Sequence, residues 1–173
     1  MKIINNASQL VYFGVIVLQV ILFGNLDLKI SQWISKKLYL NLIQFGLEKE
    51  DVILQSVKKY FNTKKMLKSL NKYCVYDAED ISTHTRYEIK ARRNKYNTYP
   101  TTIIPYHKRN GAKDGKRLIF VFGFTDGLYY IIYNENLFNQ FETKDVTYYR
   151  EGIQPKPLKH YCIPIELLTL IHL

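Results

Sequence analysis

The chain has 173 residues and a formal net charge of +10, and it is 47% hydrophobic and 14% aromatic, with only 8 glycines and 5 prolines. This length and balance fit one globular domain with a buried core, and they exclude a disordered or repetitive chain. The two cysteines, Cys74 and Cys162, provide neither a disulfide framework nor the spacing of a zinc site.

The positive charge is concentrated in the middle of the chain. Residues 61–116 contain 13 basic and 5 acidic side chains, against 7 and 4 in residues 1–60 and 5 and 6 in residues 117–173. A local basic surface is the electrostatic signature of a polyanionic partner such as DNA. A solvated lysine-rich face is the alternative explanation.

An apolar run, residues 10–24, lies near the start and is interrupted only by Gln19. A membrane-spanning helix needs about 20 apolar residues, so the run is short for that role, although the lysines that follow it suit a membrane anchor. Two interpretations remain, an anchor or uncleaved signal and a buried element of the fold. The spacing predicts an amphipathic helix over residues 28–45, and we treat residues 1–46 as an N-terminal segment.

From residue 48 the pattern changes to one helix followed by strands. Acidic residues at positions 48, 50 and 51 open a helix that runs to about Phe61, with an apolar stripe along it. A strand over residues 73–76 leads to Asp77, and a polar turn follows. The returning strand is predicted from Thr85 to Arg93.

The later elements are predicted from apolar alternation and from turn residues. They are a short strand or helix start at 101–104, a basic loop at 107–116, a hairpin of 118–124 and 128–133 with its turn at 125–127, a short helix at 134–141, a strand at 161–165 and a terminal helix from Glu166.

An acid followed two residues later by lysine occurs four times, at residues 27–29, 88–90, 114–116 and 142–144. The copy Glu88-Ile89-Lys90 is the one that lies on a predicted strand preceded by a strand ending in an acid. Side chains two apart on a strand point to the same face. Glu88 and Lys90 should therefore project together, with Ile89 turned into the core.

Asp77 should complete this group. If the hairpin turns about residues 82 and 83, Asp77 lies directly across from Glu88, with Cβ atoms about 4.5–5.5 Å apart. Two carboxylates at that separation repel each other unless a cation such as Mg²⁺ lies between them. Lys90 would then orient a water or stabilise charge that develops on a phosphate.

Two alternatives accompany this interpretation. Asp80 is a competing first acid, but it would lie opposite Thr85 and not opposite Glu88. The hairpin could also be an ordinary surface element, whose exposed ion pairs contribute under about 1 kcal/mol each.

The sequence Tyr76-Asp77, a hairpin, and then Tyr87-Glu88-Ile89-Lys90 resembles the PD-(D/E)XK superfamily of restriction-endonuclease-like nucleases, over roughly residues 48–133. The resemblance implies an α/β fold with a restriction-endonuclease-like core, a mixed central β-sheet flanked by helices, and it makes residues 47–173 a nuclease-like domain. It departs from the family motif because no proline precedes Asp77.

The resemblance also implies roles for particular residues. Asp77, Glu88 and the backbone carbonyl of Ile89 would bind Mg²⁺ or Mn²⁺, and Glu50 or Glu48 on the preceding helix would be a further ligand. Lys90 would assist hydrolysis.

A run of cations and aromatics follows the motif, and a second basic pair lies a little later in the chain. Arginine and lysine would hold phosphates, and tyrosine could stack on a splayed base. The candidate nucleic-acid-binding residues are Arg92, Arg93, Lys95, Tyr96, Lys108 and Arg109. A turn with packed tyrosines is the alternative explanation.

Three functions therefore follow from the sequence. The first is a Mg²⁺-dependent endonuclease that hydrolyses DNA inside the cell, with a homodimer as one arrangement. The second is a non-catalytic nucleic-acid-binding module of the same fold. The third is a membrane-associated protein, held through residues 10–24, whose basic surface binds anionic lipid.

Overall fold

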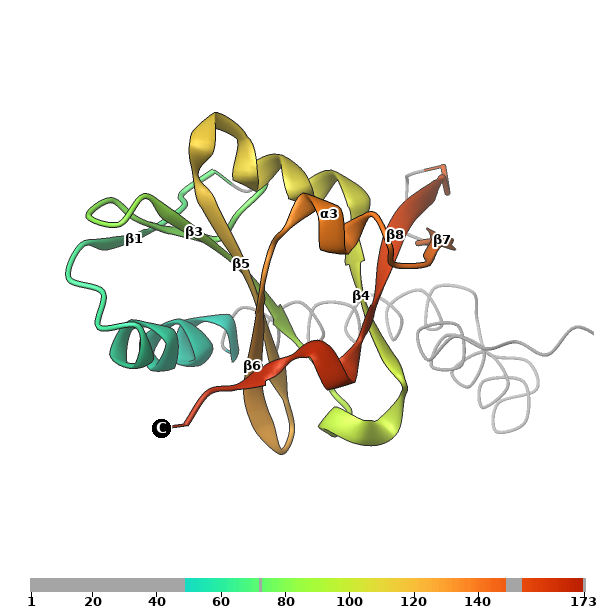
Figure 1. Cartoon of the computed structure of the whole chain (residues 1–173), viewed down its shortest axis with the longest axis horizontal. Coiled ribbons are helices and arrows are strands. Elements are labelled where there is room, and N and C mark those ends of the chain that lie inside the picture. The colour runs from blue at the N-terminus through green and yellow to red at the C-terminus, as the bar shows by residue number, and fades with distance from the viewer. Residues whose placement is uncertain (1–48, 72, 149–153, 173) are drawn as a thin grey trace, which may run out of the picture. The chain divides into compact units, whose positions relative to one another are not determined.

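Two β-sheets and a helix form the framework of the described chain, which comprises residues 49–71, 73–148 and 154–172 of a computed structural model (Figure 1). The fold is mixed α/β, with few helices and a mostly antiparallel mixed sheet. The predicted α/β class and mixed sheet are confirmed at this level. The predictions for residues 10–24 and 28–45, and for Glu48, lie outside the described residues.

The larger sheet has six strands in the order β1-β2-β3-β5-β6-β9. Neighbouring strands are antiparallel, except that β3 and β5 are parallel. The strands are β1 (Met66–Lys68), β2 (Ala78–Asp80), β3 (Thr85–Ala91), β5 (Arg117–Phe124), β6 (Gly127–Ile132) and β9 (Thr169–Leu170).

The smaller sheet has three antiparallel strands in the order β4-β8-β7. They are β4 (Thr101–Pro105), β8 (Pro157–Pro164) and β7 (Thr143–Thr147). The described helical segments are residues 49–60, η1 (Tyr96–Thr98), η2 (Tyr106–Gly115), α3 (Glu135–Phe138) and η3 (Ile165–Leu167). The connection from β3 to β5 therefore passes through β4 and η2.

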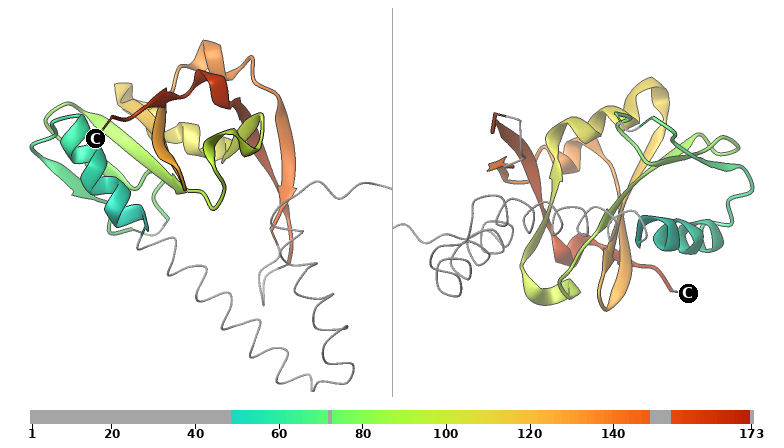
Figure 2. Two further views of the ribbon diagram at one scale, coloured as in Figure 1. Left: turned by 90° about the horizontal axis from the view of Figure 1, so that it is seen from below. Right: turned by 180° about the vertical axis from the view of Figure 1, so that it is seen from behind.

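Strand β5 is buried on both faces because its side chains alternate between two cores. Ile119 and Val121 pack in the core that contains the helix of residues 49–60. Phe120 and Phe122 pack in the core that contains β4, β8 and α3. The helix and the smaller sheet consequently cover opposite faces of the larger sheet (Figure 2).

Several predicted elements are confirmed. The helix ends next to Phe61, the returning strand is β3, and residues 101–104 lie on a strand. The predicted hairpin is β5–β6, closed by the pair Phe124↔Gly127. The helix predicted at 134–141 exists as the shorter α3, which Asn134 caps by accepting a hydrogen bond from the Leu137 N–H at 3.0 Å.

Other elements differ from the prediction. Residues 73–76 form turns and bends, and the strand begins only after Asp77, where backbone hydrogen bonds to β3 become available. The expected loop at 107–116 is largely the 3₁₀ segment η2, and the expected terminal helix is η3 followed by strand β9. Strands β1, β2, β7 and β9 were not predicted, since each is short and is held by pairing with another segment.

Candidate functional site

The β2–β3 hairpin sets the position of the two acids that compete for the site. Asp80 pairs with Thr85, as predicted, and Ala78 pairs with Tyr87 across a four-residue loop. The buried Asp80 carboxylate accepts hydrogen bonds from the Ser82 N–H at 3.0 Å and the Thr83 hydroxyl at 3.0 Å. Burial opposes ionisation, but these hydrogen bonds outweigh it and lower the pKa of Asp80. Asp80 is thus a turn-stabilising residue.

Asp77 lies where the β2–β3 ladder ends. Ala78 is the register partner of Tyr87, yet the Asp77 N–H also donates to the Tyr87 carbonyl at 2.8 Å. Two consecutive residues therefore face one, as in a β-bulge, which re-aims the side chain. The Asp77 carboxylate accepts a hydrogen bond from the Ile89 N–H at 2.6 Å. Asp77 therefore accepts a hydrogen bond from β3 at Ile89, one residue after Glu88. It does not lie directly across from Glu88, as the sequence had predicted.

Glu88 and Lys90 project together from β3, and Ile89 is buried in the core on the opposite face, both as predicted. The Lys90 Nζ lies 2.6 Å from Oε1 of Glu88. Lys108, carried by η2, donates to Oε2 of Glu88 at 2.8 Å. Glu88 has no exposed surface, so two ammonium groups flank one fully buried carboxylate.

The two contacts to Glu88 differ in kind. The contact with Lys108 has hydrogen-bond geometry, whereas the contact with Lys90 is an ion pair without it. Oε1 therefore accepts no hydrogen bond from any residue that the structure describes. A buried carboxylate oxygen without a donor is costly unless a cation lies against it, and the Lys90 ammonium group is that cation for Oε1.

Glu50 brings a third carboxylate into this neighbourhood from the helix of residues 49–60. Burial and the Asp77 carboxylate raise the pKa of Glu50, and Glu88 acts in the same direction. Burial also raises the pKa of Glu88, even though the ammonium groups of Lys90 and Lys108 oppose it. The Asp77 carboxylate thus disfavours ionisation of both Glu50 and Glu88, and acids gathered in this way attract cations.

Lys90 responds to the same charges in the opposite sense. Burial acts to lower the pKa of Lys90, but the carboxylates of Glu88 and Asp77 outweigh it and raise the pKa above its ordinary value. The side chain is therefore a protonated ammonium group at neutral pH. It can stabilise developing negative charge or donate a proton, and it does not act as a general base.

The donor chemistry of Asp77, Glu88 and Glu50 fits a hard divalent cation, which prefers carboxylate oxygens. Over residues 49–71, 73–148 and 154–172, however, no three acids, histidines or cysteines are grouped closely enough to hold a metal ion as they stand. In this arrangement the Lys108 ammonium group forms an ion pair with Oε2 of Glu88.

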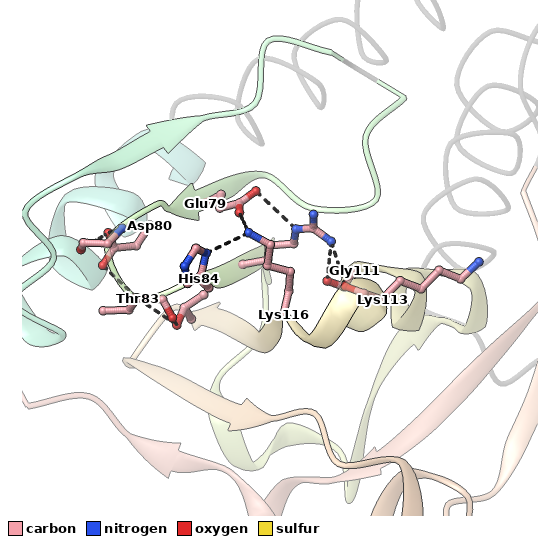
Figure 3. Close-up of polar contacts among 10 residues, drawn as sticks. Glu79, Asp80, Thr83, His84, Gly111, Lys113 and Lys116 are labelled. Atoms are coloured by element: carbon pink, nitrogen blue, oxygen red, sulfur yellow. Dashed lines mark hydrogen bonds and ion pairs between the residues drawn. The ribbon is translucent and has the colours of Figure 1, made fainter.

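A polar cluster fastens η2 to the β2–β3 hairpin (Figure 3). Arg86 on β3 donates to the Gly111 carbonyl of η2 at 3.1 Å, and its guanidinium lies 3.3 Å from Glu79. Lys116 lies 2.9 Å from Glu79 and 3.1 Å from Nδ1 of His84. The second half of η2 is thereby tied to β3 through Gly111, and the residue that follows η2, Lys116, is tied to β2.

Sequence reasoning did not identify Lys108 as a partner of Glu88. The two residues are separated by a crossover that visits the other sheet, so no local spacing relates them. The one available signal was the position of Lys108 in the basic part of the chain.

The other candidate nucleic-acid-binding residues occupy different surroundings. Arg92 donates to the Thr102 hydroxyl at 3.1 Å and to the Ile103 carbonyl, and burial lowers its pKa to about 10. Tyr96 stacks on Tyr129 with ring centroids 4.0 Å apart. Arg92 therefore joins the end of β3 to β4, and Tyr96 joins η1 to β6.

Three cations of that set remain at or near the surface. Arg93 and Lys95 are exposed, and the Arg109 guanidinium lies 4.2 Å from the Tyr106 ring centroid on η2. Lys108, of the predicted set, reaches the acidic group directly. These cations remain candidates for contacts with phosphate.

No family model, curated protein or solved structure matches this chain. No helix within the described part of the chain is long and apolar enough to cross a membrane.

Proposed function

We propose that the chain is a divalent-cation-dependent nuclease that hydrolyses DNA phosphodiester bonds at the group formed by Asp77, Glu88 and Lys90. The observation that carries the proposal is the pairing of Lys90 with the fully buried Glu88, beside Asp77 bound to the intervening Ile89 N–H. A strand that holds a carboxylate and an ammonium group together in a buried position suits a reaction in which negative charge develops on a phosphate.

Each residue has a separate role in this proposal. Asp77, Glu88, the Ile89 carbonyl and Glu50 would hold Mg²⁺ or Mn²⁺, and the bound ion would supply Lewis acidity and an acidified water. Lys90 keeps its proton and stabilises the negative charge that develops on the phosphate. Arg93, Lys95 and Arg109 would contact the DNA backbone.

A non-catalytic nucleic-acid-binding module is the second candidate function. The observation that favours it is that the described acids form no ready-made set of three metal ligands. Such a module would bind DNA through the basic middle of the chain, residues 61–116, without a functional cation site.

Cleavage of supercoiled plasmid and branched DNA in Mg²⁺ or Mn²⁺ separates the two candidates. We expect the wild type to cut, and Lys90→Met and Asp77→Asn each to lose about 10²-fold or more of the rate, as for loss of an electrostatic stabiliser. Lys113→Met, an exposed lysine of η2, is the matched control and should cut normally.

Two results would count against the enzyme. If the wild type cuts neither DNA form with either ion while still binding DNA, the binding module is the correct function. Full activity in Lys90→Met would instead show that Lys90 takes no part in the hydrolysis.

A further inference from the structure

Tyr106, the first residue of η2, has two cations from different segments of the fold against its ring. The Arg109 guanidinium lies 4.2 Å from the ring centroid, and Nζ of Lys159 on β8 lies 5.0 Å from it. Arg109 follows Tyr106 by three residues, which is one turn of a 3₁₀-helix, so the two side chains lie on the same side of η2. Lys159 comes from the smaller sheet, and the ring is therefore a point where η2 and β8 meet.

The Tyr106 ring is itself held in place. It stacks on the buried Tyr161 of β8 with ring centroids 4.7 Å apart, and Tyr161 packs edge-on against Phe138 in the core. A cation over an aromatic face gains about 0.5–1 kcal/mol at an exposed site. The fixed ring therefore keeps the charged ends of two long, flexible side chains near each other.

Neither cation is neutralised by an acid. The ion pairs found among the described residues involve other side chains, and Asp145, the register partner of Lys159, forms none with it. The strongest electrostatic neighbours of Arg109 are tyrosines, Tyr106 and Tyr161 first, which are uncharged at neutral pH. Two positive charges beside one ring repel each other, and an anion bound between them would relieve that repulsion.

Both cations are open to a ligand, since Lys159 is exposed and Arg109 is partly exposed. A guanidinium group can form two parallel hydrogen bonds with a phosphate, and an ammonium group adds a compact charge from another direction. The chemistry of the pair therefore suits a phosphate group.

The pair also lies next to the candidate reaction group along η2. Lys108, directly before Arg109, donates to Oε2 of Glu88 at 2.8 Å. With three residues per turn, consecutive side chains of η2 point in different directions, so the segment presents Lys108 to the larger sheet and Arg109 to the smaller one. A DNA strand bound at Glu88 and Lys90 would therefore have η2 beside it, with Arg109 on the side of the smaller sheet.

We propose that Arg109 and Lys159, positioned on the Tyr106 ring, bind one backbone phosphate of DNA that flanks the phosphate to be cut. The inference rests on the proposed nuclease function, since it adds a contact with the same substrate. Lys159 is the new member of the DNA-binding set. It lies in residues 117–173, where acidic side chains outnumber basic ones, so the charge distribution did not point to it.

Fluorescence anisotropy of a labelled DNA duplex in EDTA tests this contact without cleavage. We expect Arg109→Met and Lys159→Met each to weaken binding about tenfold, as for loss of one charge-assisted hydrogen bond. The double variant should lose clearly less than the product of the two, because both side chains bind the same phosphate. Lys144→Met changes an exposed lysine on the opposite face of the smaller sheet and should bind like the wild type.

The outcomes separate this contact from the nuclease itself. Wild-type affinity in Lys159→Met, or losses that multiply fully in the double variant, would overturn the shared phosphate position and leave the nuclease proposal intact. The expected losses in a protein that binds DNA yet cuts none with Mg²⁺ or Mn²⁺ would support the phosphate position and overturn the nuclease. A wild type that binds no DNA would overturn both.

A second measurement uses the unaltered protein, so it does not depend on the folding of a variant. Amine acylation followed by peptide mass spectrometry should modify Lys159 several-fold more slowly once the duplex is bound in EDTA. Exposed Lys144 should react at the same rate with and without DNA. Unchanged reactivity of Lys159 at saturating DNA would show that no phosphate lies against it.

Discussion

At the scale of single residues, His160 shows how a titratable side chain is held inside this fold. It is fully buried on β8, with Nδ1 2.6 Å from the Leu158 carbonyl oxygen and Nε2 2.9 Å from the Tyr148 hydroxyl. An N–H at Nδ1 donates to the carbonyl, and Nε2 then accepts from the hydroxyl, so the neutral imidazole satisfies both contacts.

Protonation of His160 should therefore destabilise the protein. Burial lowers the pKa of His160, and His107, Arg92 and Lys144 act in the same direction, against the Leu158 carbonyl. Below the ordinary histidine pKa of about 6.5 the unfolded chain takes up more protons than the folded one, so stability is complete above that pH and declines as the pH falls.

Urea unfolding between pH 7.5 and 5.5 measures this dependence. We expect the free energy of unfolding to decrease toward pH 5.5 in the wild type and to vary less in His160→Gln. His172→Gln changes an exposed histidine and should keep the wild-type slope. Identical slopes in all three proteins would show that His160 titrates alike in the folded and unfolded states.

At the scale of elements, the approach of the helix of residues 49–60 to β5 is set by Gly123. A methyl group at Gly123 would collide with Cδ1 of Ile53 on the helix and would lie 3.2 Å from Leu128. The missing side chain therefore lets the helix bury its apolar stripe closely against the sheet.

Substitution of Gly123 by alanine should force the helix outward. We expect a loss of about 1–3 kcal/mol in the free energy of unfolding, the usual cost of overpacking a core. In the double variant with Ile53→Val, which lacks Cδ1, part of that loss should be recovered. Chemical denaturation of the four proteins of this cycle gives the coupling, and strictly additive losses would locate the strain elsewhere.

The sequence predicted those elements whose pattern is local. The alternation of Glu88, Ile89 and Lys90 and the β5–β6 hairpin both follow from a period of two and a short turn. Residues 73–76 carry the same apolar character, but they precede the first backbone pairing to β3 and so remain irregular. Strand identity there depends on a partner and not on composition.

At the scale of the whole molecule, the basic part of the chain divides into interior and surface charges. Arg92 binds the Thr102 hydroxyl and the Ile103 carbonyl of β4, while Lys95 is exposed. The sequence could not separate these roles, since burial of an arginine depends on which distant strand lies above it. It did place both residues in the region that carries the positive excess.

The DNA binding that we propose should therefore respond to Lys95. We expect affinity to fall steeply with salt, and Lys95→Ala to reduce the slope of log K against log salt by about 0.9, the effect of one lost phosphate contact on duplex DNA. Fluorescence anisotropy at several salt concentrations measures the slope. Lys144→Ala changes an exposed lysine outside residues 61–116 and should leave it unchanged.

The parallel pairing of β3 with β5 has a consequence for the order of assembly. Thr85 pairs with Arg117, 32 positions later, and the intervening chain must first cross to the smaller sheet and return through η2. Closing that loop loses entropy before any contact compensates, whereas the β2–β3 and β5–β6 hairpins can form alone. A nascent chain that ends before residue 117 contains Asp77, Glu88, Lys90 and Lys108, yet it lacks the strand that pairs with the whole length of β3. The nuclease activity that we propose should therefore arise only after β5 has docked on β3, and not during synthesis of the chain.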